Sequence, residues 1–196
     1  MAKLKASDID FTDTSDYLSE EFYEQLLADR AEAENFGPCP DLAVVNECAA
    51  LLHLEARYLD QRRYKDWLDL YTRDAVYWVP QDDRADIRRH INLMFDDRRR
   101  MEDRVLRQLS NFAHSVRPDR FFQRTVANVE AWHMPDGRRR VLASQVAYEY
   151  RRGRHVDQYV YRTDHTLREV DGAWKIAVKR SSLLNMDAAV EPPTLL

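Results

Sequence analysis

The side chains that could hold a redox metal in this chain are few and scattered. Its six histidines are His53, His90, His114, His133, His155 and His165, and its two cysteines are Cys39 and Cys48. A Rieske iron–sulfur cluster needs two thiolates and two imidazoles, and mononuclear non-haem iron takes two histidines and one carboxylate. No histidines follow the cysteines at the short spacing of a Rieske loop, and Cys48 and His53 do not share a helical face. We therefore predict no redox metal on this chain.

His165 is the strongest single candidate for acid–base chemistry. It alternates with Tyr159 and Tyr161 in a strand-like pattern, so the three side chains share one face of a predicted strand. Burial and neighbouring hydroxyl groups could tune this imidazole for proton transfer. A core histidine with a satisfied ring nitrogen is the commoner situation when no carboxylate partner can be identified. Both interpretations stay open at this point.

Arginines form the other conspicuous group of polar side chains. They are Arg84, Arg88, Arg89, Arg98, Arg99, Arg100, Arg104 and Arg107, followed by Arg117, Arg120 and Arg124. The planar guanidinium pairs with carboxylates through two bonds and is favoured at protein interfaces. An interface with carboxylates, including those of the acidic N-terminal segment, and a solvated helix face are equally good explanations. The formal net charge of -4 disfavours a nucleic-acid-binding protein.

Length and composition indicate one soluble globular domain. The chain has 196 residues, of which 44% are hydrophobic and 33% charged, with only 4 glycines. No apolar run approaches the roughly 18 residues of a membrane-spanning helix, and the first residues do not resemble a secretory signal. Two cysteines cannot form a disulfide framework. We therefore expect a cytoplasmic protein.

The chain is predicted to consist of an N-terminal arm and one domain, and its first half is predicted to be mainly helical. Residues 1–40 are rich in Asp and Glu and are expected to form an acidic arm, within which Ser19 could start a short helix. The domain proper is expected over 41–196. Asp41 can cap a long helix whose apolar residues recur every three or four positions up to Leu59. Further helices are predicted over 64–71 and roughly 84–109, with a strand over 75–79 that ends at Pro80.

From about Phe121 the hydrophobic period changes from helical to two. Strands are predicted over 123–132, 138–152, 155–169 and 173–183, joined by short turns as consecutive antiparallel hairpins. The sides expected to face the helices are Leu142, Val146, Tyr148 and Tyr150, then Tyr159, Tyr161, Thr163, His165 and Leu167, then Trp174, Ile176 and Val178. A bulge would invert part of this assignment. The predicted fold is α+β, with a curved antiparallel sheet wrapped around the N-terminal helices to form a cone.

Residues 55–80, EARYLDQRRYKDWLDLYTRDAVYWVP, carry a family resemblance. The residues that carry it are Glu55, Leu59, Asp60, Trp67, Leu68, Asp74, Tyr77 and Pro80, and the shorter segments 95–98, 103–105, 128–129 and 171–176 add to it in order and spacing. Together they resemble the small (beta) subunit of bacterial aromatic-ring-hydroxylating dioxygenases, which have a cystatin-like, nuclear transport factor 2-like fold. The resemblance covers roughly residues 41–185.

The resemblance implies that this chain is structural and has no catalytic, cofactor-binding or metal-binding residues of its own. It implies a hexamer of three large (alpha) and three small subunits, in which the small subunits form a trimer. The large subunit would hold the Rieske [2Fe-2S] cluster and the mononuclear iron, and a reductase, in some systems with a ferredoxin, would deliver electrons from NAD(P)H. Both atoms of O2 would be added to an aromatic ring. The residues considered for the subunit interface are Trp67, Tyr77, Arg98, Arg104 and Arg120.

Two other functions remain as alternatives. Isomerases and dehydratases of the same fold use a cavity Asp, Tyr or His as general acid and base, and the candidates here are Asp60, Tyr77 and His165. In structural terms, Asp60 could instead cap or bridge the first two helices and Tyr77 could pack in the wall of the cone. A non-catalytic ligand-binding or protein-interaction module is the third possibility.

Overall fold

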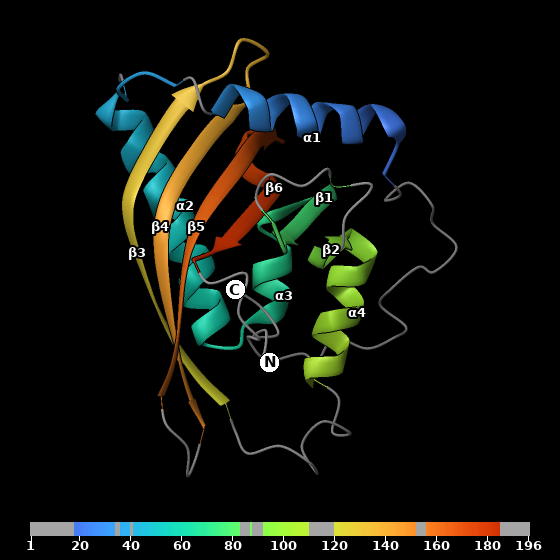
Figure 1. Cartoon of the computed structure of the whole chain (residues 1–196), viewed down its shortest axis with the longest axis vertical. Helices are drawn as coiled ribbons and strands as arrows, with labels where there is room; N and C mark the ends of the chain where they lie inside the picture. The colour runs from blue at the N-terminus through green and yellow to red at the C-terminus, as the bar shows by residue number, and fades with distance from the viewer. Residues whose placement is uncertain are drawn as a thin grey trace.

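A six-stranded sheet curves around a core to which three helices contribute, and a fourth helix lies across its other face (Figure 1). The computed structural model describes residues 18–33, 36–39, 41–82, 87, 92–109, 120–151 and 156–184. The helices are α1 (Glu20–Ala33), α2 (Leu42–Asp60), α3 (Tyr64–Leu68) and α4 (Arg98–Leu109). The strands are β1 (Tyr71–Pro80), β2 (Asn92–Asp97), β3 (Arg120–His133), β4 (Arg139–Arg151), β5 (Val156–Val170) and β6 (Ala173–Leu183). The predicted α+β fold with a curved, open sheet is confirmed.

The long helix α2 supplies much of the inner layer. Asp41 caps it as predicted, because its Oδ1 accepts a hydrogen bond of 2.8 Å from the backbone N–H of Ala43. The residues that α2 buries are Val44, Cys48, Leu52, Glu55, Ala56 and Leu59. This stripe packs on the concave face of the sheet, mainly against β3, so α2 fixes the inner wall of the cone.

The strand order in the sheet is β2-β1-β6-β5-β4-β3. The strands β3 to β6 pair antiparallel in sequence order, as predicted from their turns. The addition to the prediction is that β1 lies parallel to β6, so the first strand of the domain is held by the last. The sheet is therefore antiparallel except at this one junction of the described strands.

The segment between β1 and α4 differs from the prediction of one helix over 84–109. Residues 92–97 form β2, which pairs with β1 along Val76–Val79, and the helix begins only at Arg98. Asp97 marks the change from strand to helix. Its Oδ1 accepts a hydrogen bond of 2.8 Å from the backbone N–H of Arg100 and so caps α4. The earlier part of the predicted helix falls largely outside the described residues. The second predicted helix ends at Leu68, and Tyr71 already belongs to β1.

The side chains that face the helices were predicted correctly on β5, partly on β6 and wrongly on β4. On β4 the inward set of buried residues is Val141, Ala143, Gln145, Ala147 and Glu149, with buried arginines at both ends of the strand, whereas Tyr148 and Tyr150 are 40% and 45% exposed. The error arose because the inward set contains polar residues. Their polar groups are hydrogen-bonded inside the domain, so their burial costs less than polarity alone suggests.

A bulge on β6 explains the partial result there. The register pairs Ile176 with Leu167 but Val178 with Thr166, so the alternation shifts by one residue between them. Ile176 packs in the main core, and Val178 lies on the outer face of the sheet in a second, smaller cluster beneath α1. After the bulge Lys179 points inward, and it is fully buried.

Candidate functional site

The carboxylate of Glu55 is the centre of a buried polar cluster inside the cone. Its Oε1 accepts hydrogen bonds from the hydroxyl of Tyr71 at 2.5 Å, the Nζ of Lys179 at 3.0 Å and the indole Nε1 of Trp67 at 3.3 Å. All four side chains are at most 2% exposed. We call Glu55, Trp67, Tyr71, Lys179 and His165 the Glu55 cluster.

Different elements bring these residues together. Glu55 lies on the apolar stripe of α2, Trp67 lies in α3, and Tyr71 is the first residue of β1. Lys179 comes from β6, where the bulge has turned it inward. It lies directly opposite His165 on β5 in the antiparallel ladder, so both side chains reach Glu55 from the same side.

His165 is fully buried at the second oxygen of the same carboxylate. Its Nε2 lies 3.6 Å from Oε2 of Glu55, which is an ion-pair distance but longer than a hydrogen bond. Neither ring nitrogen makes a hydrogen bond within the described part of the chain. The structure therefore confirms the predicted inward direction of His165 and supplies the carboxylate neighbour that the sequence did not reveal.

The charges in the cluster stabilise the ionised form of Glu55. Burial alone raises the pKa of its carboxyl, but Lys179, His165 and the Tyr71 hydroxyl outweigh this and hold the pKa well below its ordinary value. Burial lowers the pKa of Lys179, and the adjacent Glu55 carboxylate opposes that change. For Tyr71, burial followed by the Glu55 charge and hydrogen bond raises the pKa, so the phenol stays protonated as a donor.

This arrangement predicts a loss of stability in acid. A carboxyl whose pKa is lowered on folding stabilises the protein above its unfolded-state pKa of about 4.3, and that stabilisation disappears as the pH falls toward the folded-state pKa. We expect the free energy of unfolding, measured by urea titration, to fall between pH 5 and 3 by about 1–2 kcal/mol through this residue. Glu55→Gln should flatten this dependence, whereas Glu47→Gln, at a 61% exposed side chain, should not. An unchanged pH dependence in Glu55→Gln would contradict the assignment.

Tyr77 is fully buried beside the Glu55 cluster, where it packs against Trp67, which is itself fully buried. Their rings meet edge to face with centroids 6.3 Å apart, and Nζ of Lys179 lies 5.4 Å from the ring centroid of Tyr77. Tyr77 therefore packs in the wall of the cone. Because neither residue reaches the surface of the chain, any effect of theirs on a partner acts through the packing of this domain.

Asp60 lies at the end of α2 and is bound by Arg124. Its Oδ2 accepts a hydrogen bond of 2.9 Å from the backbone N–H of Arg124, and its Oδ1 accepts one of 2.5 Å from the guanidinium of the same residue. The sequence-based alternatives placed Asp60 either between the first two helices or in an acid–base site. The structure instead uses Asp60 to fasten α2 to β3.

The three arginines considered for an interface make contacts within the chain. Arg98 donates to the carbonyl oxygens of Leu68 at 2.5 Å and Tyr71 at 3.4 Å, and it is 7% exposed. Arg104 pairs with Asp96 at 2.6 Å, and Arg120 pairs with buried Glu149 at 3.2 Å. Arg98 therefore links the start of α4 to the end of α3 and the start of β1. Arg104 and Arg120 remain partly accessible.

The described residues offer no ligand set for a Rieske cluster or mononuclear iron. No group of three or more His, Cys, Asp or Glu side chains in this part of the chain is arranged to hold a metal ion. The thiol of Cys39 donates to the carbonyl of Ala131 at 3.0 Å, and Cys48 is buried in α2, where burial raises the pKa of its thiol. The donors within the described ranges do not fit either iron group.

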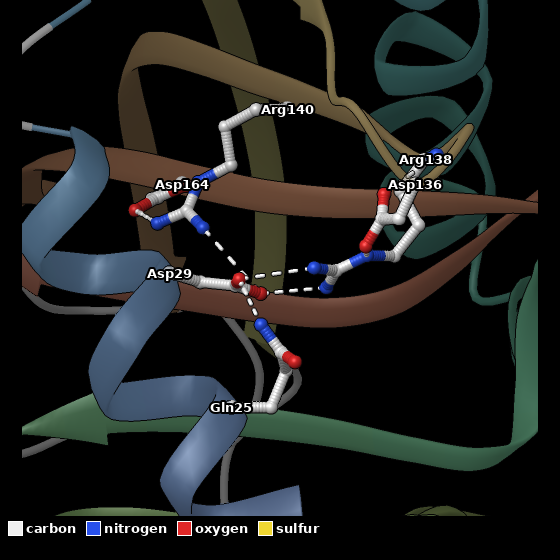
Figure 2. Close-up of polar contacts among 6 residues, drawn as sticks. All are labelled: Gln25, Asp29, Asp136, Arg138, Arg140 and Asp164. Carbon is white, nitrogen blue, oxygen red and sulfur yellow. Dashed lines mark hydrogen bonds and ion pairs between the residues drawn. The ribbon is translucent and has the colours of Figure 1, made fainter.

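A second polar cluster lies outside the cone, where α1 crosses the sheet (Figure 2). Asp29 of α1 is 3% exposed and accepts from both terminal nitrogens of Arg138, at 2.6 and 3.0 Å. Gln25 donates to the same carboxylate at 2.7 Å, and a guanidinium nitrogen of Arg140 lies 3.9 Å from it. Arg140 in turn is held by Asp164. Asp29 of the acidic N-terminal segment thus pairs with arginines of β4 and of the turn before it.

Sequence analysis singled out His165 but missed Glu55 and Lys179 as its neighbours. A usable signal was present, because Glu55 interrupts an otherwise apolar helical stripe between Leu52 and Leu59. A charge at such a position indicates a buried carboxylate with partners. The identity of those partners was hidden, since Lys179 is 124 positions away in the chain.

Comparison with known proteins gives a consistent group of relatives. Residues 54–187 match the family model described as "Ring hydroxylating beta subunit". The small oxygenase component of the p-cumate 2,3-dioxygenase system of Pseudomonas putida is 32% identical over 141 residues, which cover 70% of this chain and 78% of the relative. The beta subunit of toluate 1,2-dioxygenase from the same species is 32% identical over 58% of this chain and 69% of its own length.

Solved structures agree with the sequence relatives. The beta subunit of benzoate 1,2-dioxygenase from Burkholderia mallei ATCC 23344 is 30% identical, with a TM-score of 0.64 over 77% of this chain and 95% of that chain. A chain of naphthalene 1,2-dioxygenase with indole bound shares the fold, with a TM-score of 0.71 at 22% identity over 91% of this chain and 94% of that chain. None of the helices in the described ranges has the length and apolar character needed to span a membrane.

Proposed function

This chain belongs to the beta-subunit family of aromatic-ring-hydroxylating dioxygenases, and from that membership we propose that it is the structural, non-catalytic subunit of its oxygenase. In this proposal it assembles in the cytoplasm with a large (alpha) subunit as a hexamer of three large and three small chains. The large subunit carries the Rieske cluster and the mononuclear iron. A reductase, directly or through a ferredoxin, supplies electrons from NAD(P)H.

The observation that carries the proposal is the family match over 54–187. The Glu55 cluster supports it, because its carboxylate is already bound by Trp67, Tyr71 and Lys179, all buried. A stand-alone isomerase or dehydratase would need a general base that a substrate can reach. The cluster instead joins α2 to β1, β5 and β6, which suits a rigid support.

Co-purification tests the assignment directly. When this chain is tagged and co-expressed with the Rieske-type large subunit from the same genome, we expect both chains to elute together in equal amounts with iron and acid-labile sulfide. The tagged chain expressed alone should carry no stoichiometric iron and consume no O2 with an aromatic substrate. His165→Ala should change stability but leave the turnover per assembled complex unchanged. Iron binding and turnover by the isolated chain would refute the proposal.

We also propose that the assembled oxygenase acts on an aromatic carboxylic acid. The relatives at 30% identity or more that are described above are named for p-cumate, toluate and benzoate, which are all benzoic acids. The test is O2 uptake by the purified complex with benzoate, p-toluate and naphthalene at equal concentration. Faster uptake with naphthalene than with either acid would contradict this substrate class.

A further inference from the structure

The helix α1 lies outside the family match and covers the outer face of the sheet at one end (Figure 1). Its residues Leu26, Phe22 and Tyr23 join a small apolar cluster with Trp78 and Val178, separate from the main core. Trp78 and Val178 are 2% and 8% exposed beneath this helix. The outer face of the sheet therefore has an apolar groove that α1 fills.

The dimensions of α1 match this groove. Its 14 residues rise about 21 Å, and the four interstrand spacings from β4 to β2 span about 19 Å. Asp29 is held by Arg138, and Tyr23, six positions earlier on the helix, stacks on Phe95 of β2 with ring centroids 5.8 Å apart. The contacts of α1 therefore reach from the turn before β4 to β2.

The seat of Asp29 is specific for a carboxylate. Two parallel N–H···O bonds from Arg138 match the two carboxylate oxygens, and Arg140 adds a second guanidinium nearby (Figure 2). Asp136 and Asp164 hold these two arginines in place. The groove is therefore suited to bind a helix that has an apolar residue followed three positions later by a carboxylate, as Leu26 and Asp29 are in α1.

We propose that this groove is a docking site for an acidic amphipathic helix and that α1 occupies it reversibly as an intramolecular latch. An isolated helix of about 14 residues is marginal in water, so α1 is expected to unfold when it leaves the groove. No residue of α1 belongs to the main core cluster, so that core keeps its packing when the latch opens, while Trp78 and Val178 of the smaller cluster lose their cover.

The segment before α2 indicates that α1 docks on its own chain. Phe36 stacks on Trp132 with centroids 4.9 Å apart, and the indole of Trp132 donates to the carbonyl of Gly37 at 3.1 Å. Cys39 is also tied to β3 through Ala131. These contacts anchor the connection close to the groove, which gives α1 a high effective concentration there.

Hydrogen exchange on the full-length chain tests whether the latch opens separately. Asp29→Lys places a cation against two arginines, and Glu32→Lys makes the same charge change at an exposed position of α1. We expect Asp29→Lys to raise the exchange rate of α1 amides at least about tenfold while β4 to β6 keep their protection, and Glu32→Lys to have little effect. Unchanged α1 exchange in Asp29→Lys, or loss of protection throughout the sheet, would overturn the proposal.

A labelled peptide of residues 18–33 tests the groove as a docking site. By fluorescence anisotropy it should bind full-length Asp29→Lys at least about tenfold more tightly than the wild type, whose own α1 competes. The peptide carrying Asp29→Lys should lose this binding. Equal binding to both proteins, or none to the variant, would count against the groove. A concentration-dependent wild-type dimer whose α1 becomes protected only on association would assign the occupant to a second copy instead.

Discussion

Glu55→Ala should lower the free energy of unfolding by about 3–5 kcal/mol, because it leaves the Lys179 ammonium buried without its carboxylate. The same change removes the acceptor of Tyr71 and Trp67, so two further buried donors lose their partner. A domain of this size ordinarily has a free energy of unfolding of about 5–15 kcal/mol, so this loss removes a large fraction of the stability. Chemical denaturation followed by tryptophan fluorescence measures the effect.

Glu47→Ala is the matched control for this experiment. Glu47 also pairs with an arginine, Arg139, but its side chain is 61% exposed, and such pairs contribute at most about 1 kcal/mol. Replacing both members of the buried pair by methionine should recover part of the stability lost in Glu55→Ala, since no charge is then left unpaired. If Glu55→Ala and Glu47→Ala cost the same, the Glu55 cluster does not stabilise the cone as described.

Trp67→Ala should be the other large loss, by about 3–5 kcal/mol. Trp67 is fully buried in the main core, makes edge contacts with Tyr71 and Tyr77, and donates to Glu55. The substitution removes a large apolar surface and leaves a cavity that the rigid sheet cannot close. Thermal unfolding of the isolated chain should show the loss even with no large subunit present.

Trp67→Phe separates packing from hydrogen bonding. It retains most of the ring volume and loses the indole donor, so its cost should be about 1–2 kcal/mol. If Trp67 acted mainly at a subunit interface, Trp67→Ala would weaken assembly while leaving the isolated chain as stable as the wild type. That outcome would contradict its placement in the core.

Local patterns in the sequence were sufficient for most of the fold. The cap at Asp41, the stripe of α2 and the turns between β3 and β6 depend on short-range chemistry, and all were predictable. The segment 92–97 was not, because its strand character comes from pairing with β1 and its arginine-rich continuation has a helical period. Tertiary pairing overrode the local pattern there.

The inward face of β4 was predicted wrongly because polar residues are buried there. Gln145 accepts 3.1 Å from the hydroxyl of Tyr161 and donates to Thr163, and Glu149 accepts from Arg151 and Tyr159. A prediction from hydrophobicity alone assigns such residues to the solvent-exposed face and so exchanges the two faces of the strand. Their burial is favourable because Tyr159, Tyr161 and Thr163 of β5 bond to them, and the local sequence does not reveal which residues pair across strands.

The candidate site was predictable in part for the same reason. The alternation on β5 was enough to direct His165 inward, and the bulge that turns Lys179 toward it has no clear local signal. The separation of 124 positions between Lys179 and Glu55 means that only the folded sheet brings them together. The family resemblance, by contrast, rested on ordered short motifs and was confirmed by the comparisons.

The parallel contact between β1 and β6 has a consequence for biosynthesis. Tyr77 aligns with Lys179 and Trp78 with Arg180, so the β1–β2 ribbon can join the sheet only after β6 has been synthesised, about 100 residues later. Closing so large a loop is slow compared with forming the hairpins of β3 to β5. In a nascent chain the Glu55 carboxylate therefore meets the Lys179 ammonium only after β6 has been synthesised, so the buried ion pair is among the last contacts of the cone to form.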